Sequence, residues 1–97
     1  MTTKRTLEDL RGDIDRVDQE ILKQLHERVG LVLEVGRYKR ERAAKIYDPD
    51  RERSVIARLR EGAGHSLDAD TIQRIFERII DEMRTIQRVR MVSDGDK

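Results

Sequence analysis

The chain has 97 residues, of which 42 % are charged and 3 % aromatic, and acids and bases nearly balance at a net charge of +1. This charge disfavours nucleic-acid binding, the absence of cysteine excludes disulfides and cysteine-bound metal, and no apolar run is long enough for a membrane span or a signal peptide. His26 and His65 lie far apart and lack the spacing of metal ligands. These features predict one helical domain in the cytoplasm, without a metal site.

A long first helix is predicted from Leu7 to about Ala43, with Thr6 as N-cap and Asp9 as its capping-box partner. No proline interrupts it, and at 1.5 Å per residue it is roughly 50 Å long. A compact domain of this size has a radius of gyration of only about 13 Å. Such a helix cannot bury its apolar face against its own chain alone, so we expect a second chain beside it.

Two cations interrupt the apolar face of this helix. Apolar residues recur at helical spacing at Leu7, Leu10, Ile14, Val17, Ile21, Leu25, Val32 and Val35. Arg28 and Lys39 continue the same series, and a cation among apolar side chains is unfavourable by several kcal/mol unless it is paired. Either a carboxylate of the chain or an anionic ligand must neutralise them. Gly30 and Gly36 either permit a close approach or are simply tolerated in a long helix.

Two shorter helices follow. Asp48 as N-cap and Pro49 at the first helical position predict the start of the second helix, and Gly62-Ala63-Gly64 predicts its end. The third helix is predicted to start after Asp68. Their apolar faces comprise Val55, Ile56 and Leu59 in the second helix, and Ile72, Ile75, Phe76, Ile79, Ile80, Met83 and Ile86 in the third. Residues 93–97 are expected to form a polar tail.

Four polar residues lie on inward faces: Arg28, Lys39, Glu52 and Gln87. Each has a structural explanation on its own, since Glu52 can pair with Lys39, Gln87 can bond a backbone group and Arg28 can extend to solvent. Together, convergent polar groups in an apolar enclosure are typical of a small-ligand pocket. The surplus of positive charge indicates an anion, and the planar fork of arginine suits a carboxylate.

The ordered set of motifs resembles the all-helical (AroQ-type) chorismate mutases, over roughly Leu7 to Gln87. The matching segments are Leu10-Arg11-x-x-Ile14-Asp15-x-x-Asp18-x-x-Ile21-Leu22-x-x-Leu25-x-x-Arg28, Val35-Gly36-x-x-Lys39, Asp48-Pro49-Asp50-Arg51-Glu52-Arg53, and Ile79-Ile80 with Gln87. The resemblance implies an all-α fold of three helices with a long first helix, as an intertwined homodimer. It also implies a mutase domain at residues 1–92 that converts chorismate to prephenate, in phenylalanine and tyrosine biosynthesis. No metal, cofactor or covalent intermediate is expected.

The resemblance also assigns the groups that hold the substrate. Arg28, with Arg11 from the partner chain, is expected to bind its two carboxylates, and Arg51 to order that end. Read alone, Arg11 and Arg51 are ordinary surface arginines. Met83 stands where many relatives carry a small hydroxyl residue that assists a carboxylate, so this contact is expected to differ here.

Further residues are expected to contact the reacting bond and the ring. By the resemblance, Lys39 contacts a carboxylate and the ether oxygen, and Gln87 donates a hydrogen bond to the same oxygen. Glu52 and the Asp48 segment bind the ring hydroxyl. Selecting the folded, reactive conformer of the substrate is catalysis by orientation, and the donors stabilise charge on the ether oxygen as its bond breaks.

Three alternatives remain from the sequence. The first is isochorismate-pyruvate lyase on the same scaffold, which Glu52 disfavours because the lyase lacks this acid. The second is a helical interaction protein without chemistry. The third is a weak mutase that another shikimate-pathway enzyme activates. No fused domain is expected after Gln87, and no feedback site for phenylalanine or tyrosine is recognisable.

Overall fold

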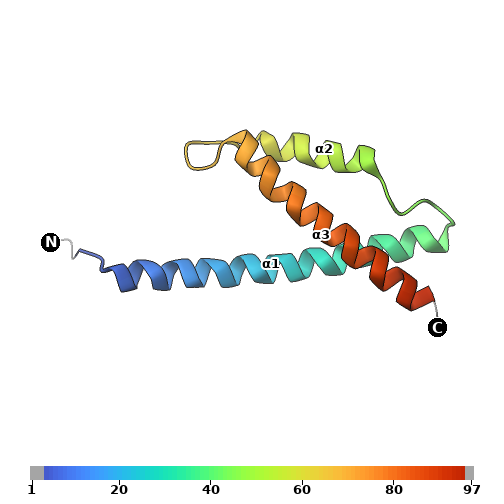
Figure 1. Cartoon of the computed structure of the whole chain (residues 1–97), viewed down its shortest axis with the longest axis horizontal. Coiled ribbons are helices and arrows are strands. Elements are labelled where there is room, and N and C mark those ends of the chain that lie inside the picture. Colours follow the sequence, from blue (N-terminus) through green and yellow to red (C-terminus); the bar gives the residue numbers. More distant parts are fainter. Residues whose placement is uncertain (1–3, 96–97) are drawn as a thin grey trace.

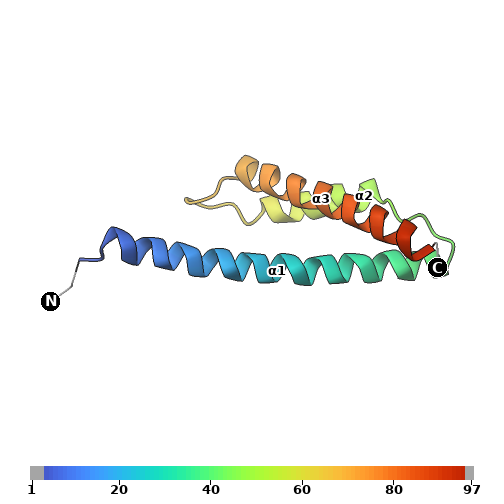
Figure 2. The same cartoon turned by 60° about the horizontal axis from the view of Figure 1, so that its bottom comes forward.

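The computed structural model describes residues 4–95, with side chains up to Val92, and this part of the chain is helical without any strand. The helices are α1 (Leu7–Glu41), α2 (Pro49–Arg60) and α3 (Ala69–Gly95). Figure 1 shows α3 running obliquely across the C-terminal half of α1, and Figure 2 shows α2 and α3 on the same side of α1. The all-α prediction of three helices with a long first one is confirmed.

Local capping chemistry sets the start of each helix. Thr6 and Asp9 form the predicted capping box on α1. Asp48 accepts a hydrogen bond from the backbone N–H of Arg51 at 3.0 Å, and Asp68 accepts one from Thr71 at 2.7 Å. The bonds from Thr71 lower the pKa of the Asp68 carboxyl below its ordinary value, because they favour the ionised form. The three predicted N-caps are therefore confirmed.

The helix ends differ from the prediction by a few residues. α1 ends at Glu41 instead of about Ala43, and Ala43 adopts the left-handed conformation with φ of 53°. α3 continues to Gly95, so residues 93–95, predicted as the start of a polar tail, are helical. Residues 96–97 of that predicted tail lie outside the described part of the chain.

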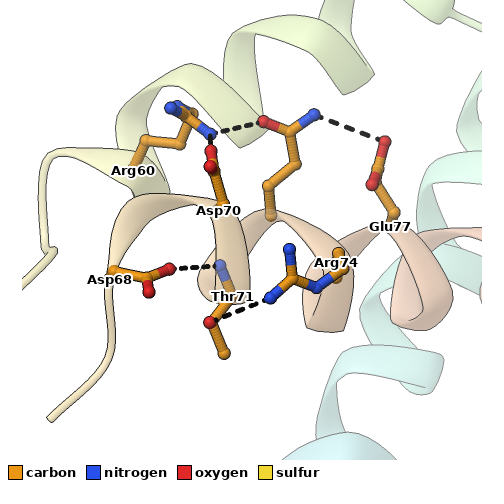
Figure 3. Close-up of polar contacts among 7 residues, drawn as sticks. Arg60, Asp68, Asp70, Thr71, Arg74 and Glu77 are labelled. Carbon is orange, nitrogen blue, oxygen red and sulfur yellow. Dashed lines mark hydrogen bonds and ion pairs between the residues drawn. The ribbon is translucent and has the colours of Figure 1, made fainter.

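The loop between α2 and α3 is held by a polar network at its two ends. Figure 3 shows Arg60, at the end of α2, turned toward Asp70 at the start of α3. The Arg60 guanidinium donates to Asp70 at 3.0 Å and to the side-chain oxygen of Gln73 at 2.7 Å. The amide of Gln73 in turn donates to Glu77 at 3.4 Å. These bonds fix the direction in which α3 leaves α2.

α3 is the central helix, because it packs on both α1 and α2 while those two do not contact each other within residues 4–95. The buried apolar side chains lie on α3 and the C-terminal half of α1: Leu33, Ile72, Ile80, Met83 and Met91. None of the helices within residues 4–95 combines the length and apolarity needed to cross a membrane.

The N-terminal half of α1 extends past the other helices (Figure 1). Its large apolar side chains are exposed, namely Leu7, Leu10, Ile14, Val17, Ile21 and Leu22. The protein measures 63 × 30 × 17 Å, and its radius of gyration of 18.0 Å exceeds the roughly 13 Å of a compact domain of this length. The prediction that α1 cannot bury its apolar face within its own chain is confirmed.

Candidate active site

A cavity of about 310 Å³ lies between α1 and α2 and is closed by α3. Its walls combine apolar and charged side chains: Arg28, Leu31, Val32, Val35 and Lys39 from α1, Ile46, Tyr47 and Asp48 from the loop, Arg51, Glu52 and Val55 from α2, and Ile80, Met83, Arg84 and Gln87 from α3. The structure thus brings seven of the eight predicted site residues to one cavity. The eighth, Arg11, lies elsewhere.

Arg28 is half-buried on the α1 wall. Its guanidinium donates to the thioether sulfur of Met83 at 2.9 Å, and sulfur is a weak acceptor. Burial, and after it the charge of Arg51, lowers the pKa of Arg28 from its ordinary value. No carboxylate among the described side chains lies within 4.0 Å of Arg28, so its charge has no ion-pair partner within the described chain.

Lys39 lies at the other end of the same wall, three helical turns further along α1. Its ammonium donates to the backbone oxygen of Ile46 at 3.3 Å and lies 3.8 Å from Asp48. The alternative in which Lys39 pairs with Glu52 is wrong, because the loop before α2 brings Asp48 to the lysine first. Asp48 has two functions here, since its other oxygen caps α2 through the N–H of Arg51.

Glu52 pairs instead with Arg84, a cavity residue that the sequence analysis missed. The guanidinium of Arg84 donates from Nε and Nη2 to the two carboxylate oxygens, at 3.1 and 2.5 Å. These bonds raise the pKa of Arg84 above its ordinary value. A signal for Arg84 exists in the sequence, because it falls four residues after Ile80 and three before Gln87 on the same helical face.

Gln87 reaches the cavity where α3 crosses α1. Its amide donates to the backbone oxygen of Val32 at 2.8 Å. The backbone hydrogen bond considered for Gln87 from the sequence is therefore present. An amide carries a second N–H, which leaves a donor for a ligand. Gly36 permits this approach, since a Cβ there would lie 3.3 Å from the Gln87 nitrogen and 3.0 Å from the sulfur of Met91. Gly30, in contrast, faces open space.

The charges of the cavity do not balance. Of its four cations, Lys39 and Arg84 face carboxylates at 3.8 and 2.5 Å. Arg28 and Arg51 face none among the side chains that the structure describes, and Arg51 is exposed at the mouth. Four cations and an amide in one cavity suit the binding of an anion and the donation of hydrogen bonds.

Arg11 is exposed on the N-terminal half of α1. It precedes Arg28 by 17 positions, a distance of roughly 25 Å along a helix. An arginine side chain cannot span that distance. Within one chain Arg11 therefore does not reach the cavity.

Residues 10–88 match the model of the family described as chorismate mutase type II. The chain belongs to this family. The identification made from the sequence motifs is confirmed, and so is the prediction of an isomerase, since chorismate mutases are isomerases.

Individual relatives agree with this family. The chain is 40 % identical over 83 residues to the bifunctional chorismate mutase/prephenate dehydratase of Escherichia coli K12, covering 84 % of the chain and 22 % of that protein. It is 31 % identical over 83 residues to the chorismate mutase of Methanocaldococcus jannaschii, covering 84 % of each. It is 30 % identical over 88 residues to the 4-amino-4-deoxychorismate mutase of Streptomyces venezuelae, covering 90 % of the chain and 85 % of that protein.

The fold agrees as well. The solved structure of chorismate mutase (form II) from Thermus thermophilus superposes with a TM-score of 0.81 at 34 % identity, over 84 % of this chain and 93 % of that one. Family and relatives together support chorismate mutase activity. The chain spans only about a fifth of the E. coli protein, so the further activity of that protein carries no argument here.

Proposed function

We propose that the protein rearranges chorismate to prephenate in the cavity between α1 and α2, on the route to phenylalanine and tyrosine in the cytoplasm. One observation carries the proposal: Arg28 and Arg51 face the cavity without a carboxylate partner among the described residues. Unmatched guanidinium groups suit an anionic substrate with two carboxylates, because each planar fork can bond both oxygens of one carboxylate. Arg28 binds the carboxylates together with Arg11 of a second chain, and Arg51 orders that end.

The arginines act on the shape of the substrate. Chorismate is flexible, and only its folded conformer brings the two reacting carbons together. Binding both carboxylates at fixed positions selects that conformer, which converts binding energy into orientation. The contact of Arg28 with Met83 supports this role, because a weak sulfur acceptor holds the guanidinium in the cavity and yields to a carboxylate.

Lys39 and Gln87 act on the ether oxygen. The C–O bond breaks ahead of C–C bond formation, so negative charge gathers on that oxygen in the transition state. Lys39 is anchored by Ile46 and Asp48, and Gln87 by Val32, and each retains an N–H to donate. A prepositioned donor of this kind contributes roughly 3 kcal/mol to transition-state stabilisation. The rearrangement is concerted and requires no proton transfer.

The ring hydroxyl of the substrate is assigned to the α2 side of the cavity. Glu52 is half-buried there, with its carboxylate held by Arg84, and each of its oxygens retains a lone pair that can accept a hydrogen bond. Asp48 lies beside it at the start of α2.

A second copy of the chain is proposed to complete the site through Arg11. The accessible surface of 8198 Å² exceeds the roughly 5,800 Å² of a compact monomer of this size. Two α1 helices can pair antiparallel so that Arg11 of one chain lies level with Arg28 of the other. In this register the midpoint of the pair falls between residues 19 and 20 of each helix. That register places exposed Leu7 opposite Val32 and Ile14 opposite Leu25, so the exposed apolar face of α1 is covered.

Incubation of the purified protein with chorismate alone tests the function, with prephenate measured by chromatography. We expect conversion that scales with protein concentration and that Arg28→Ala abolishes, whereas Arg16→Ala, on the exposed surface of α1, retains it. No conversion by the protein, alone or with cell extract containing an activating pathway enzyme, contradicts the proposal. Salicylate and pyruvate formed from isochorismate would instead support the lyase.

The name of one relative supplies a second compound to compare with chorismate. The Streptomyces venezuelae protein is named for 4-amino-4-deoxychorismate, which carries an amino group where chorismate has the ring hydroxyl. The same rearrangement applies to both compounds, so they should be assayed side by side.

A further inference from the structure

Arg84 is a cavity residue without a part in the proposed reaction. It forms a bidentate ion pair with Glu52, it lies 3.2 Å from Asp81, and its guanidinium stands over the ring of Tyr47 at 5.2 Å. These contacts come from α2, from α3 itself and from the loop before α2. They fix the guanidinium at the α2 side of the cavity, to which the ring of the substrate is assigned.

The pair changes the charge that the substrate ring meets. A lone Glu52 would present a negative charge, and such a charge favours an ammonium group over a hydroxyl group. With Arg84 bound to both oxygens, Glu52 still accepts hydrogen bonds but the pair is neutral as a whole. Asp81, which also contacts Arg84, is exposed and does not line this cavity. The other cavity carboxylate, Asp48, faces Lys39 at 3.8 Å. Within the described part of the chain the cavity thus presents no unpaired carboxylate.

We propose that Arg84 is a positioning residue that sets substrate specificity: it orients and neutralises Glu52, so that the cavity accepts a ring hydroxyl and disfavours a ring ammonium. The inference rests on the proposed function and assigns the preferred substrate class of the same site. Amines of this kind are protonated at neutral pH, so 4-amino-4-deoxychorismate carries a positive charge where chorismate is neutral. Next to the neutral Glu52–Arg84 pair, that charge has no partner.

The test compares kcat/KM for chorismate and for 4-amino-4-deoxychorismate on the same enzyme preparation. The ratio of the two values cancels any loss of folded protein. In the wild type we expect a preference for chorismate. In Arg84→Met the ratio should move toward the amino substrate by about tenfold or more, because Glu52 then faces the cavity unpaired. Arg84→Gln should shift it in the same direction, since its amide can hydrogen-bond Glu52 without charge.

Three further variants separate charge from structure. Arg84→Lys should return the ratio toward the wild-type value, and so should the double variant Arg84→Gln with Glu52→Gln, because neither leaves an uncompensated carboxylate. Arg88→Met, at an exposed position one helical turn further along α3, should leave the ratio unchanged. An unchanged ratio in Arg84→Gln and Arg84→Met overturns the inference. A wild-type protein that converts neither compound overturns the proposed function, and this inference with it.

Discussion

Hydrogen bonds to weak or backbone acceptors hold three polar groups of the cavity in place. Arg28 is held by a thioether, Lys39 by the carbonyl of Ile46, and Gln87 by the carbonyl of Val32. These three acceptors are uncharged, so they fix the side chains without an ion pair, and of the three side chains only Lys39 also lies near a carboxylate, that of Asp48 at 3.8 Å. Each group is therefore oriented before a ligand arrives, which limits the conformational entropy lost on binding.

The two proposed ether-oxygen donors give the most direct prediction at this scale. Lys39→Ala and Gln87→Ala should each lower kcat/KM for chorismate by about a hundredfold, because each removes a donor that acts mainly in the transition state. Steady-state kinetics measures the loss. Arg37→Ala, at an exposed position two residues before Lys39, is the matched control and should keep the wild-type rate. Near-normal turnover in either cavity variant would contradict the assignment of that residue.

Single residues show what the sequence could and could not predict of the site. Arg28, Lys39, Glu52 and Gln87 were recognisable because they interrupt apolar helical faces, a property of local spacing. The contacts between helices were not recognisable, because they join residues far apart in the sequence. The pairing of Glu52 with Arg84 spans 32 positions, and only the packed fold decides it over Lys39.

At the scale of the helices, the crossing of α1 and α3 depends on a glycine, which has no side chain to separate the two helices. Gly36 is buried where α3 passes, whereas Gly30 is exposed six residues earlier on α1. The sequence alone does not distinguish the two glycines, whereas in the structure only Gly36 contacts α3. Close packing at this crossing is what brings Gln87 to the carbonyl of Val32.

Gly36→Ala should therefore lower activity with little loss of stability. The new Cβ would meet the Gln87 amide at 3.3 Å and displace it, while the flexible end of Met91 can yield. Alanine gains about 1 kcal/mol in helix propensity, which offsets the strain. Gly30→Ala is the control, because nothing lies within 4 Å of its Cβ, and it should raise stability and retain activity. Urea denaturation and kcat/KM measure the two effects, and equal activity in both variants would contradict this role of Gly36.

Helix starts are the elements that the sequence predicted best, because an N-cap needs only neighbouring residues. Thr6, Asp48 and Asp68 each bond the backbone N–H three positions on. The ends of α1 and α3 were placed less well, since packing between helices decides how far each one continues.

The cap of α3 makes stability depend on pH in one direction. Hydrogen bonds from Thr71 lower the pKa of Asp68 in the folded state, so its contribution is complete above the unfolded pKa of about 3.9. That contribution is lost as the pH falls through the lower, folded-state value. Asp68→Asn keeps a capping side chain that does not titrate. Below pH 4 the wild type should lose stability faster than this variant, as measured by urea denaturation at pH 7 and pH 3. Parallel losses in the two proteins would contradict the effect.

At the scale of the whole molecule, the helices of one chain leave the site open on one side. α1 and α2 do not contact each other within the described residues, and the N-terminal end of α1 extends past the other helices (Figure 1). The need for a second chain was predictable from the length of α1 alone. The sequence did not predict which side of the cavity a partner would complete, because that side depends on how α3 places α2 over α1.

Mixing two inactive variants tests whether a partner supplies Arg11. Arg11→Ala and Arg28→Ala should each be inactive as homodimers, because each removes one carboxylate clamp from both sites. Random exchange makes half of the dimers mixed, and each mixed dimer regains one intact site of two, so about a quarter of wild-type activity should return.

A second mixture controls for effects of refolding. Arg28 and Lys39 lie on the same wall of one cavity, so no mixed dimer of Arg28→Ala with Lys39→Ala contains an intact site, and this mixture should remain inactive. Recovery in the first mixture and none in the second would place Arg11 across the interface. Because Arg11 lies roughly 25 Å along α1 from Arg28, failure of the first mixture would mean that Arg11 takes no part in the site.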